Sequence, residues 1–234
     1  MPSEAIINRF RIGAWPRVTA LLSIVVVFVF LLQLALAPDG CWSTRYPAFC
    51  VELVLLREVT WLGVLLMPFL HGSWLHLGGN LLMLTIFGGG TEHLYGRRQL
   101  LWLFFAGGYL STELQLLQKL AADQPPVTVG ISGAVYGLGA FLGVMLLPAS
   151  RRALAESRKL DSGGAAMIRP PLLVMGLFTF AHALLSHAGF VSIDPRAATL
   201  THLTGVVFGA GTAVYLRIFG TRRFELSIPT NPFN

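Results

Sequence analysis

The chain has 234 residues, of which 54% are hydrophobic and 12% are charged, about half the charged fraction of ~25% that is usual for soluble domains. The mean hydropathy of +0.67 excludes a disordered chain, and two cysteines in 234 residues exclude a disulfide-stabilised scaffold. The formal net charge is +6. Because the basic residues are distributed as described below, we attribute this excess to membrane topology and lipid contact and expect no nucleic acid partner.

The charged residues leave long charge-free windows, each able to cross a bilayer, which takes about 20 apolar residues. The first window follows three arginines and is too long for a signal peptide, so we expect a retained helix. The window 59–91 exceeds one span, which predicts an interfacial or re-entrant piece around 61–70 and a span that starts near Trp74. A further apolar stretch carries one charge, Glu113. The predicted spans are 18–37, 74–94, 99–118, 129–147, 170–188 and 198–216.

The positions of Lys and Arg predict the orientation of these six spans. With a cytoplasmic N-terminus, thirteen of the seventeen basic residues fall on the cytoplasmic side, as the positive-inside rule requires. We therefore expect a cytoplasmic segment 1–17, a six-helix membrane domain 18–217 and a cytoplasmic tail 218–234, with no seventh span and no soluble domain. The four basic residues on the outer side are Arg45, Arg57, Lys119 and Arg196.

Two connections differ in character. The outer segment 38–73 is long, half apolar and aromatic, so we expect it to lie on the membrane surface. It contains Cys41 and Cys50, whose pairing the spacing leaves open. The segment 148–169 is basic and contains Gly and Ser, and is predicted to be a cytoplasmic connector.

Polar side chains within the spans indicate function, because they are costly in hydrocarbon. The second, fourth and sixth predicted helices all begin at the outer surface. Their opening turns carry His76 and Asn80, Ser132, and His202 respectively. Three separate segments thus bring a hydroxyl, two imidazoles and a carboxamide to one depth just below the outer interface.

Ser132 lies in the sequence Gly130-Ile131-Ser132-Gly133 at the predicted start of a helix. Glycines allow the backbone to approach a ligand, and the free amides of a helix N-terminus can bind an oxyanion. The alternative is that Gly133 and Gly137 form a small-residue packing face with a serine beside it.

His202 shares one helical face with the glycines three and seven positions later, Gly205 and Gly209. That face would let a neighbouring helix approach closely and bring His202 within reach of Ser132, as a nucleophile and its base require. A purely structural membrane histidine is the alternative. No carboxylate lies near His202 in the sequence, so any serine catalysis would use a Ser–His dyad. The matching face on the fourth helix consists of Ser132, Tyr136 and Gly139.

His76 and Asn80 are four residues apart and project together, so they could donate hydrogen bonds to an oxyanion or tie the second helix to neighbouring backbone. His71 would point about 140° away on a continuous helix, which predicts a structural role. Other chemistries have less support: no His-Glu-x-x-His motif is present, and all four Asp lie outside the spans. A metal held by some of five histidines stays an alternative: His71, His76, His182, His187 and His202.

These motifs together resemble the rhomboid family of intramembrane serine proteases, over residues 57–217. The resemblance rests on His71-x4-His76-x3-Asn80, on Gly130-Ile131-Ser132-Gly133 with Tyr136, on His202-x2-Gly205-x3-Gly209, and on Gly88 to Gly90 with Glu92 and Gly96. It implies an all-α polytopic bundle of six transmembrane helices with a membrane-associated first outer loop. Thr201 departs from the family, which usually has a smaller residue before the histidine.

The resemblance also implies roles. Ser132 would be the nucleophile, His202 the general base and acid, and Tyr136 the residue that orients His202 in place of an aspartate. His76, Asn80 and the Ser132 amide would form the oxyanion hole, with no metal and no cofactor. The structural residues would be His71, Glu92, Gly130, Gly133, Gly205 and Gly209.

The expected activity is a serine endopeptidase that cleaves transmembrane protein substrates in or near their membrane segments. We expect a multi-pass protein of the bacterial inner membrane, in contact with the lipid bilayer, and the sequence leaves its oligomeric state open. The alternative function is a non-catalytic rhomboid-like protein that binds client transmembrane helices.

Overall fold

The computed structural model describes residues 16–36, 61–123, 129–147, 165–187 and 199–219, and these residues are helical with short links and no strand. Six helical rods occupy the places of the six predicted spans. Two of them are composite, because each contains a π-helical turn. The elements are α2 (Arg17–Ala35), α4 (Trp61–Leu66), η2 (Met67–Phe69), α5 (Trp74–Met83), η3 (Leu84–Gly88), α6 (Gly89–Tyr95), α7 (Arg97–Trp102), η4 (Leu103–Gly107), α8 (Gly108–Ala121), α9 (Ser132–Leu146), α11 (Ala165–His187) and α12 (Thr199–Phe219).

Within the residues that the structure describes, three rods are long and apolar enough to cross a membrane, namely 17–35, 97–121 and 199–219. Many large apolar side chains on the outside of the bundle are exposed, such as Phe28 and Phe178, as expected when lipid is the solvent. The fold is therefore a helical membrane bundle. The number of six spans remains a prediction.

The boundaries show two differences from the sequence prediction. The interfacial piece before the second rod is a short helix, α4, followed by the single turn η2, and α5 begins at Trp74 as predicted. Helix α11 begins at Ala165, so the last residues of the predicted connector 148–169 are helical. Ala, Met and Ile at 166–168 favour this extension of the helix. The cysteines Cys41 and Cys50 lie outside the described residues.

The π-helical turns η3 and η4 were not predicted by apolar periodicity. Each ends at a glycine that lies against another rod. A Cβ atom at Gly88 would lie 3.3 Å from Cγ2 of Thr19 in α2, and one at Gly107 would lie 3.0 Å from the ring of Phe208 in α12. Single π-turns of this kind locally widen a helix and are frequent at functional sites.

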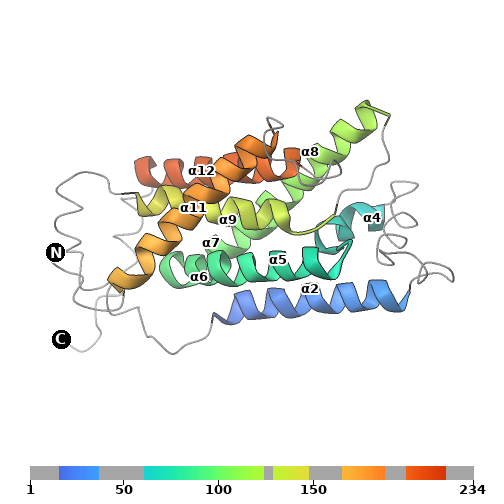
Figure 1. Ribbon diagram of the computed structural model, residues 1–234, viewed down its shortest axis with the longest axis horizontal. Coiled ribbons are helices and arrows are strands. Elements are labelled where there is room, and N and C mark those ends of the chain that lie inside the picture. The colour runs from blue at the N-terminus through green and yellow to red at the C-terminus, as the bar shows by residue number, and fades with distance from the viewer. Residues whose placement is uncertain (1–15, 37–60, 124–128, 148–164, 188–198, 220–234) are drawn as a thin grey trace.

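Helix α9 lies at the centre of the bundle, between the α5–α6 rod and α12, with α11 crossing it (Figure 1). Its residues from Ser132 to Gly143 are buried, apart from the half-buried Tyr136. Small residues make this central position possible, because they let neighbouring backbones approach.

Two glycine faces of α9 set these approaches. On one face, a Cβ at Gly205 or Gly209 of α12 would overlap the carbonyl oxygen of Gly133 or Gly137. The small-residue packing face considered from the sequence is thus present together with the buried serine. Gly139 was predicted to share the α12 face, and this prediction is wrong. A Cβ at Gly139 would instead lie 3.0 Å from Phe87 and from Thr179 of α11, and the closest approaches of α9 to α12 are at Gly133 and Gly137.

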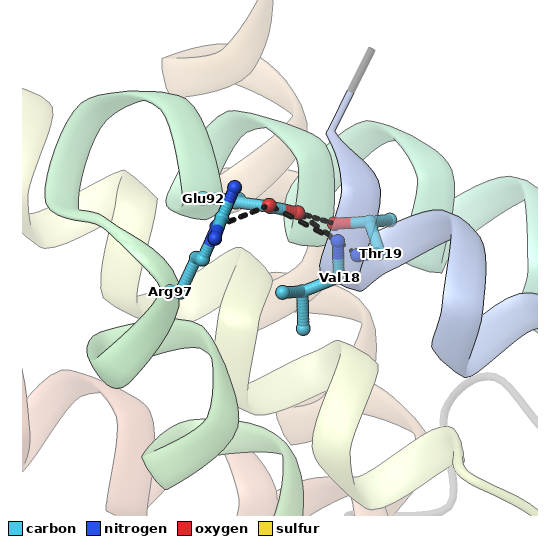
Figure 2. A network of polar contacts seen from close by, with 4 residues as sticks. All are labelled: Val18, Thr19, Glu92 and Arg97. Atoms are coloured by element: carbon cyan, nitrogen blue, oxygen red, sulfur yellow. Dashed lines mark hydrogen bonds and ion pairs between the residues drawn. The ribbon is translucent and has the colours of Figure 1, made fainter.

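A carboxylate joins three rods (Figure 2), at the end of the bundle opposite to the start of α9 (Figure 1). Glu92 of α6 accepts hydrogen bonds from the Val18 and Thr19 amides and from the Thr19 hydroxyl, at 3.1, 2.8 and 2.9 Å. It also lies 3.6 Å from the Arg97 guanidinium at the start of α7. The carboxylate therefore satisfies first-turn amides at the positive end of α2.

Candidate active site

Ser132 is the first residue of α9 and is 4% exposed. The turn before it depends on Gly130, whose φ of +101° favours glycine. The Gly130 amide donates to the Met67 carbonyl at 3.2 Å, which joins this turn to η2. The first-turn N–H groups of a helix have no intrahelical partners, so Ser132 lies at a point where the backbone itself offers donors.

His202 lies over the same face of α9. Its imidazole stacks on the ring of Tyr136 with centroids 4.1 Å apart and planes 1° from parallel. Tyr136 is four residues after Ser132, so the two side chains project from the same side of α9. One turn deeper, Gly205 lies against the Gly133 carbonyl. These contacts place the His202 imidazole on the face of α9 that carries Ser132, one helical turn along the helix at Tyr136.

The second rod brings its polar pair to the same turn. A Cβ at Gly130 would lie 3.0 Å from Nε2 of His76 and 3.2 Å from Nδ2 of Asn80. The two side chains thus converge on the backbone two residues before Ser132. Asn80 is 6% exposed. Two side-chain nitrogens, each able to act as a hydrogen-bond donor, therefore lie at the turn that leads into Ser132.

His71 also belongs to this cluster, so the prediction that it points away from His76 and Asn80 is wrong. That prediction assumed a continuous helix, but α5 begins at Trp74, and Leu70 and Ser73 before it have extended backbone. Nδ1 of His71 donates to the Phe69 carbonyl at 3.0 Å, which leaves Nε2 to accept from Nδ2 of Asn80 at 3.0 Å. Its ring centroid is 5.1 Å from that of His76.

The charge state of His71 agrees with this geometry. Burial, followed by the proximity of His76, lowers the pKa of His71 to about 3. The ring is therefore neutral near pH 7, and a neutral imidazole has one donor and one acceptor nitrogen. Nδ1 is the donor because it faces the Phe69 carbonyl, and Nε2 is the acceptor for the Asn80 amide.

Gln33 near the end of α2 holds the His71 backbone. Its Oε1 accepts from the His71 amide at 3.0 Å, and its Nε2 donates to the His71 carbonyl at 3.4 Å. The side chain is 3% exposed. Sequence reasoning did not select Gln33, although an amide inside an apolar span is the same kind of signal as His76 or Ser132.

Two further contacts tie α12 and α11 to the site. The Gln115 side chain of α8 accepts from the Thr201 amide at 3.3 Å, at the start of α12. The Tyr136 hydroxyl lies 2.7 Å from Nδ1 of His182 in α11. The contact between His182 and Tyr136 could not be predicted from the sequence, because it depends on how α11 crosses α9.

Thr201, the departure from the family pattern, is buried against Gly133. A Cβ at Gly133 would lie 2.9 Å from its Cγ2 atom, so the glycine accommodates the larger neighbour. Within the described part of the chain, no group of three or more His, Cys, Asp and Glu side chains is placed to hold a metal. His187, one of the histidines considered for a metal, has no described side chain.

Two comparisons with known proteins give a match. The sequence model of the Rhomboid domain matches residues 58–219 of the chain. The chain is also 30% identical over 141 residues to a Danio rerio protein named presenilin-associated rhomboid-like protein A, mitochondrial. This similarity covers 55% of the chain but only 34% of that relative.

Proposed function

The chain belongs to the rhomboid family, and from this premise we propose that it is an intramembrane serine protease that hydrolyses peptide bonds in or near the transmembrane segments of other membrane proteins. The observation that carries the proposal is the stacking of His202 on Tyr136, one helical turn from Ser132. In the proposed enzyme, His202 serves as the base for the buried serine, and the stacking supports this role because it restricts the plane of the imidazole ring.

In the proposed reaction, the Ser132 hydroxyl attacks the substrate carbonyl carbon and passes its proton to His202. A C–O bond forms, and the carbonyl electrons move onto oxygen. His76, Asn80 and the Ser132 amide stabilise that charge as the oxyanion hole. His202 then returns the proton to the leaving amine as the C–N bond breaks. Water attacks the resulting ester by the same route in reverse and frees Ser132.

The substrate must present an extended peptide bond to this site. A transmembrane helix hides its peptide groups in its own hydrogen bonds, so cleavage requires local unwinding. We propose substrates whose membrane helices contain Gly, Pro or small residues near the outer interface. The bilayer and such helices are the proposed partners.

The orientation proposed from the sequence has support from the bundle. One end carries Glu92 with Arg97, and Arg217, which donates to the Val144 and Leu147 carbonyls at the end of α9. The opposite end carries Ser132. The basic end is the one that the positive-inside rule assigns to the cytoplasm, so the site would open outward. The bacterial inner membrane is our proposed location.

The test uses the full-length protein in detergent with a fluorophosphonate probe. We expect covalent labelling of Ser132 and cleavage of a model transmembrane substrate. Ser132→Ala should lose both while the far-ultraviolet circular dichroism spectrum and the elution volume stay unchanged. A folded protein that binds the substrate but neither labels nor cleaves would instead support the non-catalytic binder.

A further inference from the structure

Helix α11 contributes a histidine to the edge of the site that the reaction above does not use. His182 is half-buried, and its Nδ1 atom lies 2.7 Å from the hydroxyl of Tyr136. The ring centroids of these two residues are 5.9 Å apart. Tyr136 therefore makes two contacts: its ring face stacks on His202, and its hydroxyl forms a hydrogen bond with His182.

The hydrogen bond restricts the orientation of the tyrosine ring. A tyrosine on a helix can move between staggered χ1 rotamers, and stacking on one side does not fix where the distal end of the ring lies. A bond of 2.7 Å between an O–H donor and an imidazole nitrogen is short and directional. It holds the hydroxyl, and with it the plane against which His202 lies.

Close backbone packing between α11 and α9 sets the position of His182 along the α9 axis. A Cβ at Gly176 of α11 would lie 2.8 Å from the Cα atom of Gly143. Less than two turns later, Ala183 is fully buried in a cluster with Ala140 and Val206. The position of α11 along α9 therefore determines whether His182 can reach Tyr136.

We propose that His182 is a positioning residue for His202, acting through Tyr136. The inference rests on the proposed protease function. In this arrangement two side chains from two other helices fix the His202 imidazole plane: His182 of α11 holds Tyr136 of α9, and Tyr136 holds His202 of α12. A displacement of α11 away from α9 breaks the first contact and releases the base.

The main experiment compares His182→Phe, which keeps a ring but removes the nitrogen, with Tyr136→Phe, which removes the hydroxyl. Each should lower kcat and the rate of fluorophosphonate labelling about tenfold, the scale of one neutral hydrogen bond. KM and Tm should stay close to the wild-type values. The double variant should be no slower than either single variant, because both remove the same bond.

Two variants serve as controls. His182→Asn places a side-chain oxygen near the position of Nδ1 and should restore most of the rate. Phe178→Leu changes an exposed neighbour whose ring lies 6.1 Å from that of His182, and should leave the rate unchanged. Multiplicative losses in the double variant, or an unchanged rate in His182→Phe, would overturn the inference.

A second readout does not depend on activity. His202 lies within the ring current of Tyr136, so nuclear magnetic resonance of histidine-labelled protein should show the His202 ring signals shifting in His182→Phe and in Tyr136→Phe alike. Unchanged His202 signals in His182→Phe would refute the coupling whatever the activity. If wild-type Ser132 is not labelled but these shifts appear, the protease proposal fails while the structural coupling holds.

Discussion

The rings of Tyr136 and His202 lie parallel, 1° apart in plane, with centroids separated by 4.1 Å. They come from α9 and α12, whose backbones meet where Gly205 lies on the Gly133 carbonyl. In a triad, a carboxylate would hold the imidazole by a hydrogen bond. Here the flat face of a tyrosine restricts the ring instead.

The first prediction concerns this stack. Tyr136→Leu keeps an apolar side chain at this position but removes the flat ring surface, so the His202 imidazole can rotate away from Ser132. We expect kcat to fall at least tenfold with KM little changed, measured on a fluorogenic transmembrane substrate in detergent. A change in KM alone would show that Tyr136 contacts substrate and does not orient the base.

The second prediction concerns the donors beside Gly130. Loss of one oxyanion donor typically costs about 100- to 1000-fold in turnover. Asn80→Ala and His76→Ala should each lower turnover by this amount. Both variants should retain measurable activity and leave Ser132 open to covalent labelling. If turnover were intact and substrate binding weakened, the two residues would grip substrate and the assignment to the oxyanion hole would be wrong.

The third prediction differs from the expectation drawn from sequence alone, which gave His71 only a role in stability. Because Nε2 of His71 accepts from Asn80, His71→Ala should lower turnover as well as Tm. In an Asn80→Ala background the same change should lower Tm with little further loss of turnover, since its partner is already absent. Independent losses of turnover would mean that His71 acts on the reaction by another route.

The principal residues of the site could be chosen from the sequence because polar groups are rare inside apolar spans. This criterion selected Ser132, His202, His76 and Asn80. The structure stacks His202 on Tyr136 and places His76 and Asn80 beside Gly130. The rhomboid resemblance, carried by the spacing of these motifs, is confirmed by the match over residues 58–219.

The residues that were missed or misplaced depend on geometry that spacing does not contain. His71 was misplaced because the helix was assumed to continue through a link that in fact has extended backbone before Trp74. Gly139 was assigned to the wrong neighbour because α9 has close neighbours on two sides. Gln33 and His182 come from helices without a motif, so only the tertiary packing connects them to the site.

The fourth prediction tests the packing of α9 against α12. Gly209→Ala would place a methyl group on the Gly137 carbonyl, whereas Gly211 of the same helix has open space beside it. Overpacking typically costs about 1–3 kcal/mol, while an unhindered Gly→Ala change in a helix gains roughly 0.5–1 kcal/mol. We expect Gly209→Ala to lower Tm in detergent and Gly211→Ala to leave it unchanged or raise it. Equal effects would show that the two helices do not meet at Gly137.

The most direct test of the protease proposal is cleavage of a model transmembrane substrate reconstituted with the protein in liposomes, with the products identified by mass spectrometry. We expect the wild-type protein to make a single cut near the outer interface, and folded Ser132→Ala or His202→Ala to make none. Cleavage that persists in either folded variant would contradict the Ser–His mechanism, and absence of cleavage and of Ser132 labelling in the folded wild-type protein would contradict the protease assignment itself.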